Sequence, residues 1–256
     1  MIVNEIIKSA AEQLARDYAC EPGDFFAQRN RVSKARLIPG RRELRGEADF
    51  FKIATFGGVA VASVSAEMVH FTKALLAKYD VKESAELFSA AQLYLINKEL
   101  SKWGKTIGAN SIFYLPKTPC LYQPKGDFNI RVYNEAEIKA VLYKYKGFNH
   151  ALLYSNKAQG RRDVSAVCAF EGGKLAGMAG ASSDSAEFWQ IGIDVKPEYR
   201  GRGLAADLVS VLTREVFMRG AIPYYGTWGG NIASQKVALK CGYYPAWSEA
   251  VAFNEG

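Results

Sequence analysis

The chain has 256 residues, of which 49% are hydrophobic and 23% charged, a composition typical of globular proteins and far from that of disordered chains. Its 33 basic and 26 acidic residues leave a net charge of +7, which favours anionic partners without selecting a fold. No uncharged stretch reaches the roughly 20 apolar residues of a membrane-spanning helix, so we expect no transmembrane segment and no membrane partner.

The N-terminal segment predicts an amphipathic helix. Charged residues at positions 5, 8, 12 and 16 interrupt its apolar residues, which differs from the hydrophobic core of a signal peptide. We therefore expect a cytoplasmic protein. The cysteines lack the paired spacing of a zinc site, so we expect reduced, buried thiols and no metal. They are Cys20, Cys120, Cys168 and Cys241.

A basic segment follows this helix. It contains Arg29, Arg31, Lys34, Arg36, Arg41, Arg42 and Arg45. Proteins bind single-stranded nucleic acid with cations that are interleaved with aromatic side chains, and here only Phe25 and Phe26 lie nearby. We therefore disfavour a nucleic-acid partner, and nothing else in the sequence explains the segment.

The rest of the first half predicts strands followed by two helices. Residues 50–65 are rich in β-branched and aromatic residues around Gly57 and Gly58, which fits two strands joined by a turn or one strand and a tight turn. Helix formers with apolar residues at spacings of three and four occupy 67–79 and 82–103. The expected apolar face of the second helix is Leu87, Ala91, Tyr94 and Leu95.

A short strand at 111–115 leads into a proline-rich stretch at 116–126, where regular structure is interrupted. We place a domain boundary there. The sequence thus predicts a mixed helical and strand domain at 1–125 and a second domain at 126–256.

The second domain begins with a predicted strand at 128–132. A helix follows from Asn134, because Glu137 three residues later completes a capping box. Apolar runs at 164–170 and 175–181 then flank a Glu-Gly-Gly-Lys turn, which predicts a β-hairpin, since glycine accepts the positive φ of such turns.

A strand at 187–195 runs through a glycine-containing loop, 200–205, into a helix that we expect to end near Phe217. Small residues leave the loop amides uncovered, and the helix N-terminus with two arginines supplies positive charge, so the loop can cradle a phosphate. An ordinary turn with two solvated arginines is the alternative. The loop lacks the Gly-Lys-Ser/Thr of a P-loop and the third glycine of a dinucleotide fingerprint.

A further strand at 222–228 and a helix that begins at Asn231 and closes at Gly242 complete the pattern. The sequence RGRGLA at 200–205 resembles the Q/R-x-x-G-x-G/A pyrophosphate loop of the GNAT superfamily of N-acetyltransferases. The residues from Asn231 to Tyr243 resemble that family's second cofactor motif, and the order and separation of the two motifs also agree.

The resemblance implies that acetyl-CoA is bound and that its acetyl group is transferred to an amine. Pantetheine would bond to the main chain of Ile193 and Val195, and Asn231 and Ser234 would lie near the pantetheine and sulfur. Helix capping is an alternative role for that last pair. The pyrophosphate would contact Arg200, Gly201, Arg202, Gly203, Leu204 and Ala205.

The catalytic groups of the family are less well matched. Where many members carry a glutamate base, this chain has Trp189, so we predict Glu187, two residues earlier on the same strand face, as the base. Where members often carry a tyrosine acid, this chain has Ala238. Either Ser234 or a water assists the departing thiolate, or the thiolate leaves unaided.

The expected fold class is α/β (α+β), with a GNAT-type mixed, mostly antiparallel sheet of about six or seven strands flanked by helices in the second domain. The first domain can also be a degenerate copy of this fold. The predicted function is an acetyl-CoA-dependent N-acetyltransferase acting on a primary amine of a small molecule or protein. The alternative is a non-catalytic acyl-CoA-binding sensor whose N-terminal domain binds a partner. No feature indicates an oligomeric state.

Overall fold

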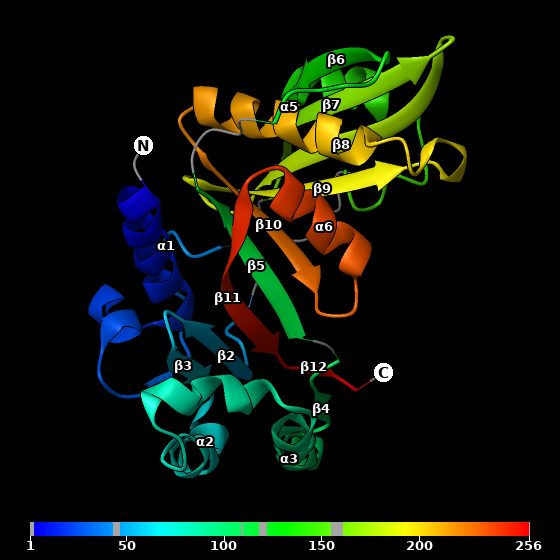
Figure 1. Cartoon of the computed structure of the whole chain (residues 1–256). Coiled ribbons are helices and arrows are strands. Elements are labelled where there is room, and N and C mark those ends of the chain that lie inside the picture. The colour runs from blue at the N-terminus through cyan, green and yellow to red at the C-terminus, as the bar shows by residue number, and fades with distance from the viewer. Residues whose placement is uncertain (1–2, 43–46, 109, 118–121, 155–160, 256) are drawn as a thin grey trace. The chain divides into compact units, whose positions relative to one another are not determined.

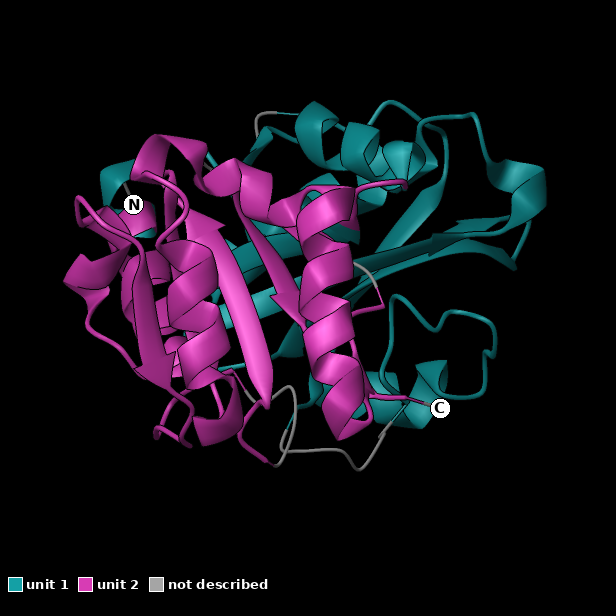
Figure 2. Cartoon of the chain, turned by 90° about the horizontal axis from the view of Figure 1, so that it is seen from below, with its two compact units in different colours: residues 1–6, 114–227, 231–245 teal, residues 7–113, 228–230, 246–256 magenta. Residues whose placement is uncertain are grey.

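The computed structural model describes residues 3–42, 47–108, 110–117, 122–154 and 161–255. The chain divides into two compact units (Figure 2). Unit 1 comprises residues 1–6, 114–227 and 231–245, and unit 2 comprises residues 7–113, 228–230 and 246–256. The helix α1 (Val3–Tyr18) and the strands β5 (Asn110–Pro116), β10 (Ile222–Trp228) and β11 (Tyr243–Val251) have residues in both units.

The proline-rich stretch that we predict as a domain boundary lies only partly in the described ranges, because residues 118–121 fall outside them. The division at residue 125 into separately folding domains therefore stays a prediction.

Unit 1 contains a mostly antiparallel sheet. Its strands include β6 (Asn129–Asn134), β7 (Asp163–Glu171), β8 (Lys174–Ser183), β9 (Phe188–Val195) and β10. They lie in the order β10-β9-β8-β7-β6, with only the β9–β10 pair parallel. The predicted hairpin is confirmed, since β7 and β8 are joined at Gly172 and Gly173, whose φ angles are +54° and +79°. The predicted α/β class is likewise confirmed.

Two layers cover the two faces of this sheet. The helix α5 (Leu204–Met218) packs on β7, β8 and β9 (Figure 1), and a Cβ added to Gly177 would lie 3.1 Å from Leu208 of α5. The neighbouring Met178 packs with Ile138 and Leu142 on the other face, because successive strand residues point in opposite directions. The remaining helices of this unit are α4 (Glu135–Glu137), a π-helical turn (Ile138–Leu142), a 3₁₀ turn (Pro197–Tyr199) and α6 (Ile232–Lys240).

Unit 2 contains a second set of paired strands. They are β1 (Arg31–Lys34), β2 (Phe51–Phe56), β3 (Val59–Val64) and β11, in the order β1-β3-β2-β11. Of the two alternatives for residues 50–65, the two-strand hairpin is confirmed, with Gly57 and Gly58 at φ +62° and +93° in its turn. A separate two-stranded sheet joins β4 (Lys105–Thr106) to β12 (Phe253–Asn254).

Short helices complete unit 2. They are α2 (Val69–Leu76), α3 (Ala90–Leu100) and 3₁₀ turns at Pro22–Phe26, Ala66–Met68, Val81–Phe88 and Ser101–Trp103. The predicted helix 82–103 is therefore broken: a 3₁₀ segment ends at Phe88, and α3 starts afresh with Ser89 as its N-cap. This break shifts the helical phase, so Ile96 and Leu100 are buried while Tyr94 is 68% and Leu95 40% exposed. The expected apolar face of this helix is wrong beyond Leu87.

The described cysteines are free thiols. Cys168 and Cys241 are buried and Cys20 is half-buried, whereas Cys120 lies outside the described residues. Among the helices in the described ranges, none combines the length and apolar character that crossing a bilayer requires.

The basic segment 29–45 does not form one charged surface. Arg42 is 3% exposed, and its guanidinium bonds to the carboxylates of Asp17 and Glu249. Arg31 pairs with Asp24 at 2.6 Å, and Arg45 lies outside the described residues. One of the seven cations is thus an internal element of unit 2.

The carboxylate of Asp17 is stabilised by this arrangement. Burial alone would raise the pKa of Asp17, but the charges of Arg42 and Lys52 and the hydrogen bonds from Arg42 outweigh it and lower the pKa below the ordinary value of 3.8. The ionised Asp17 therefore stabilises the folded state at pH values above 3.8. This contribution is lost as the pH falls through the lowered pKa of the folded state.

We predict that Arg42→Met lowers the free energy of unfolding by about 3–5 kcal/mol at pH 7, because two buried carboxylates lose their cation. The difference from the parent protein should narrow as the pH falls below 3.8. Urea denaturation from neutral to acidic pH measures both effects. The exposed Arg29→Met is the matched control, with an expected change within about 0.5 kcal/mol.

Candidate active site

The strands β9 and β10 separate part-way along their length. Their parallel pairing covers four residue pairs, from Ile222–Phe188 to Tyr225–Ile191. On its other edge, β9 stays paired with β8 as far as Val195. Within the described residues, the main chain of β9 from Gly192 to Val195 thus lacks a strand on one edge, and these residues are partly exposed. Unpaired strand edges can hydrogen-bond an extended ligand.

The predicted phosphate loop follows β9 after one 3₁₀ turn, Pro197–Tyr199. Gly201 and Gly203 have φ angles of +77° and +84°, and Gly203 is the N-cap of α5 without a side-chain cap. The amides of Ala206 and Asp207 donate to the carbonyl of Gly203. The amides that precede them in the first turn have no helical acceptor, as at every helix start, so they are available to an anion.

Two arginines flank this loop. Arg200 is exposed, and its Nε donates to the carbonyl of Val195 at 3.0 Å. Arg202 pairs with Glu171 at 2.7 Å and lies 4.5 Å above the ring of Phe128. Both guanidinium groups are therefore held beside the loop while their side chains keep contact with solvent.

Sequence reasoning missed two residues at the same place. A Cβ added to Gly203 would lie 3.8 Å from Lys240 Nζ and 3.9 Å from the hydroxyl of Tyr122. Lys240 Nζ also lies 5.2 Å from the centre of the Tyr122 ring. Lys240 lies within the second motif, so the motif could have indicated it. Tyr122 is far from both motifs in the sequence, and no local pattern predicts its position.

The carboxylate of Asp207 attaches the segment that carries Tyr122 to the first turn of α5. It accepts hydrogen bonds from Tyr122 Oη at 3.0 Å and from the amides of Lys125 and Gly126 at 3.2 Å. Arg214 adds a bond to the carbonyl of Tyr122. The segment that carries Tyr122 is therefore held by hydrogen bonds beside the loop.

A pair of hydroxyl groups lies where β9 and β10 stop pairing. Tyr225, the last paired residue of β10, is 1% exposed, and its hydroxyl is 2.8 Å from Ser234 Oγ. Burial raises the pKa of Tyr225 to about 12, so the phenol keeps its proton at neutral pH. Asn231 Oδ1 accepts from the amide of Ser234 at 3.1 Å and caps α6.

Glu187 is placed away from this group. It is exposed and precedes β9, four residues before Ile191, which corresponds to about 13 Å of strand. The structure therefore brings Ser234 to the end of the paired region, next to Tyr225, and leaves Glu187 at the opposite end of β9 from the loop.

The segment at His150 and Ala151 lies directly on β8 and β9. Asp194 Oδ2 accepts the amides of both residues, at 2.8 and 3.0 Å. A Cβ on Gly192 would lie 1.7 Å from the carbonyl oxygen of His150, and one on Gly180 would lie 1.8 Å from that of Ala151. Asp194 is thus a structural residue, and the two glycines are required by the close approach of another backbone.

Comparison with known proteins agrees with this geometry. Residues 132–243 match the family model of the acetyltransferase (GNAT) family. This segment, 112 of the 256 residues, is similar to acetyltransferase domains of that family. No curated protein matches the sequence.

A solved structure of low sequence identity has a similar fold. A GCN5-related N-acetyltransferase from Kribbella flavida shares 13% identity over 98% of this chain and 96% of its own, with a TM-score of 0.51. A GNAT-family acetyltransferase from Colwellia psychrerythraea shares 20% identity over 64% of this chain and 63% of its own, with a TM-score of 0.42. This chain spans 66%, 63% and 59% of three such structures, slightly less than two thirds of each.

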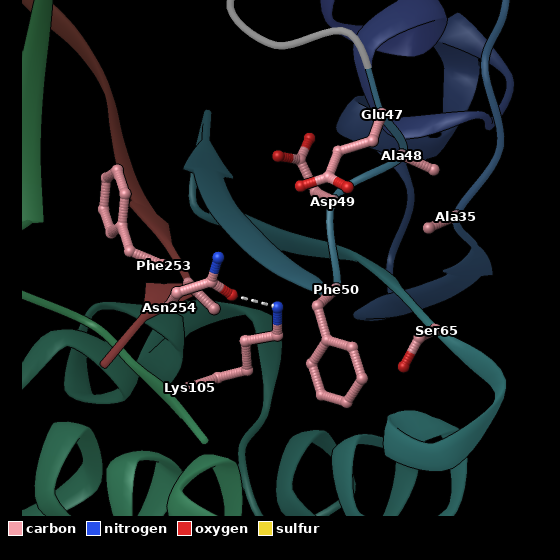
Figure 3. Close-up of a pocket in the computed structure, with 10 residues that line it drawn as sticks. Ala35, Glu47, Ala48, Asp49, Phe50, Ser65, Lys105, Phe253 and Asn254 are labelled. Carbon is pink, nitrogen blue, oxygen red and sulfur yellow. Dashed lines mark hydrogen bonds between the residues drawn. The ribbon is translucent and has the colours of Figure 1, made fainter. Parts of the chain in front are cut away.

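Unit 2 contains a cavity of about 370 Å³ (Figure 3). Figure 3 shows the carboxylates of Glu47 and Asp49 together on one wall. Asp49 pairs with Lys52 at 2.9 Å, and Lys105 Nζ bonds to Asn254. Of the described residues that line the cavity, Glu47, Asp49 and Lys105 are charged.

We predict that Gly192→Ala displaces residues 150–151 from the sheet of unit 1, because the added methyl would overlap the carbonyl oxygen of His150. The hydrogen bonds to Asp194 would be lost, and the free energy of unfolding should fall by about 2 kcal/mol or more. Thermal and urea denaturation measure the change. Gly23→Ala, where no heavy atom lies within 4 Å, is the control, and equal stability of the two variants would contradict the close packing.

Proposed function

We propose that this protein transfers an acetyl group from acetyl-CoA to a primary amine of a small molecule or a protein. The observation that carries the proposal is the close succession of two binding elements. The unpaired edge of β9 at Gly192–Val195 is followed, after the single 3₁₀ turn at Pro197–Tyr199, by the glycine loop at the N-terminus of α5. A ligand with a flexible amide-containing arm and a pyrophosphate would match both elements.

The proposed contacts of acetyl-CoA follow the two elements. The main chain of Ile193 and Val195 would pair with the pantetheine arm. The carbonyl of Val195 accepts from Arg200 Nε in the structure. We infer that Arg200 exchanges this carbonyl for a phosphate, which leaves the carbonyl available to the arm. Asn231 and Ser234 would lie near the arm and its sulfur, and the phosphates would contact Arg200, Gly201, Arg202, Gly203, Leu204 and Ala205.

The acceptor amine must lose a proton before it attacks. A lysine-like amine has a pKa of about 10.4, so it is mostly protonated at neutral pH. Glu187 remains the proposed base. Because it lies about 13 Å along the strand from Ile191, water molecules must carry the proton to it.

The leaving thiolate requires a different kind of help. Tyr225, with a pKa of about 12, is too weak an acid to protonate a thiolate outright. It can donate a hydrogen bond to Ser234 Oγ, which leaves the serine hydrogen free to point at another acceptor. We propose that the hydroxyl of Ser234 donates a hydrogen bond to the sulfur and so stabilises the thiolate. Tyr225 positions Ser234 for this bond.

A sensor that binds acyl-CoA without turning it over is the second candidate. The observation in its favour is Ala238, which is fully buried and supplies no hydroxyl where the family often has tyrosine. Saturable binding of acetyl-CoA with no release of free thiol across a broad panel of amines would favour the sensor over the enzyme.

Replacing Gly203 by aspartate or asparagine tests the phosphate loop. Both residues tolerate the left-handed conformation to a similar degree, so their backbone strain is matched. We expect Gly203→Asp to raise the Kd for CoA by about tenfold or more relative to Gly203→Asn, because the carboxylate repels the phosphates. Isothermal titration calorimetry gives both constants, and equal melting temperatures establish equal folding. Equal Kd values would contradict the loop assignment.

Substitutions at Ser234 and Tyr225 test the thiolate proposal. We expect Ser234→Ala to lower kcat by about tenfold with a smaller effect on KM for acetyl-CoA. Tyr225→Phe should have a smaller effect on kcat. The double variant should resemble Ser234→Ala, because Tyr225 acts through the serine.

Free-thiol assays of acetyl-CoA turnover measure these constants, with the exposed Ser101→Ala as the control for the serine change. The ratio of kcat for the parent protein to kcat for Ser234→Ala should be constant from neutral to mildly alkaline pH, because Tyr225, with a pKa of about 12, stays protonated throughout this range. Full activity of Ser234→Ala would exclude the serine from the reaction.

A further inference from the structure

Unit 2 has a groove of about 250 Å³ that is lined by residues of α2 and α3 and of the turns that follow them, which we call the α2–α3 groove. Figure 1 shows the two helices. Its floor is apolar and consists of Phe71, Ala74, Leu75 and Leu95. Each helix contributes to it, so the groove is built on two regular elements and not on a loop. It belongs to neither the predicted acetyl-CoA contacts nor the cavity of Figure 3.

Other large apolar side chains are exposed on α3 and in the turn after it. Tyr94 is 68% exposed, Leu95 40%, and Trp103, in the turn after the helix, 47%. The sequence pattern predicts burial for Tyr94 and Leu95, yet the break at Ser89 turns both outward. Leu95, which lines the groove, and its neighbour Tyr94 therefore expose apolar surface on α3, as is typical of interaction surfaces.

Lysines lie on both sides of the groove. Lys78 follows α2, and Lys98 and Lys102 lie in α3 and just after it. Lys102 pairs with Glu99 at 2.6 Å. In the described ranges, neither Lys78 nor Lys98 makes an ion pair. The rim therefore carries more positive than negative charge and is complementary to carboxylates.

We propose that the α2–α3 groove docks an acidic amphipathic helix of a partner protein. Apolar side chains of that helix would enter the groove over Leu75 and Leu95, and its glutamates or aspartates would pair with Lys78 and Lys98. A second copy of this chain fits less well, because a two-fold contact would bring like-charged lysines together. A membrane surface also fits less well, because the apolar residues form the floor of a concave groove with cations on both sides.

The proposal is tested with a designed probe: a fluorescein-labelled helical peptide of about 18 residues with leucines on one face and glutamates beside them. A second peptide carries lysines in place of the glutamates. Fluorescence anisotropy with the full chain should show saturable binding of the acidic peptide and binding of the basic peptide weaker by about tenfold or more.

Two charge-reversal variants locate the site. The double variant Lys78→Glu with Lys98→Glu should bind the acidic peptide about tenfold or more weakly than the parent protein does, and it should bind the basic peptide more tightly. Lys73→Glu with Lys82→Glu changes net charge equally at exposed lysines outside the groove and should leave the order of the peptides unchanged. Leu95→Ser should weaken binding of the acidic peptide, and the variant should still bind the acidic peptide more tightly than the basic one. Circular dichroism and melting curves establish that each variant folds.

Several results would overturn the proposal. One is that the acidic peptide does not bind at concentrations up to about 1 mM. Another is that both charge-reversal variants lose affinity for the acidic peptide to the same extent. Binding to anionic phosphatidylserine vesicles but not to the peptide would identify a membrane surface. Concentration-dependent dimerisation that Leu95→Ser abolishes, without peptide binding, would identify a second copy. Acetyl-CoA binding and turnover are measured in parallel, so a failure of the groove is distinguishable from a failure of the acetyltransferase.

Discussion

The end of the pairing between β9 and β10 is the constraint around which unit 1 is organised. Up to Ile191 and Tyr225 the two strands pair with each other, and beyond that point β9 pairs, among the described residues, only with β8. A polar main-chain edge without a partner costs free energy unless water or a ligand pairs with it. The opening is therefore suited to an extended polar ligand. The bond between Tyr225 and Ser234 connects the start of α6 to the last paired position.

The position of the phosphate loop follows from the same strand. Because only the 3₁₀ turn at Pro197–Tyr199 separates β9 from the loop, the unpaired edge and the free amides of α5 are close together in the chain. The bond from Arg200 to the carbonyl of Val195 couples them further, since one side chain reaches both. Fixed surroundings support the loop, with Asp207 holding the Tyr122 segment on one side and Glu171 holding Arg202. Such preorganisation lowers the cost of binding a flexible cofactor.

The net charge of +7 has several physical origins that the composition cannot separate. Arg42 serves the interior of unit 2, where it compensates two buried carboxylates. Arg200 and Arg202 lie beside the loop that we assign to phosphates. Lys78 and Lys98 line a groove with an apolar floor. Cations that look alike in sequence thus act in stability, in cofactor binding and, as we propose, in partner recognition.

Local signals in the sequence determined much of this protein: glycine turns at 57–58 and 172–173, the cap at Asn231 and the loop into α5 all depend on neighbouring residues. Local pattern could not decide which face of α3 is buried, because a one-residue break at Ser89 changes the helical phase. Nor could it place Tyr122 beside Gly203, or reveal that Gly192 faces His150, since these contacts join residues far apart in the chain. Only tertiary packing decides such contacts, because they depend on the positions of whole elements and not on the preferences of single segments.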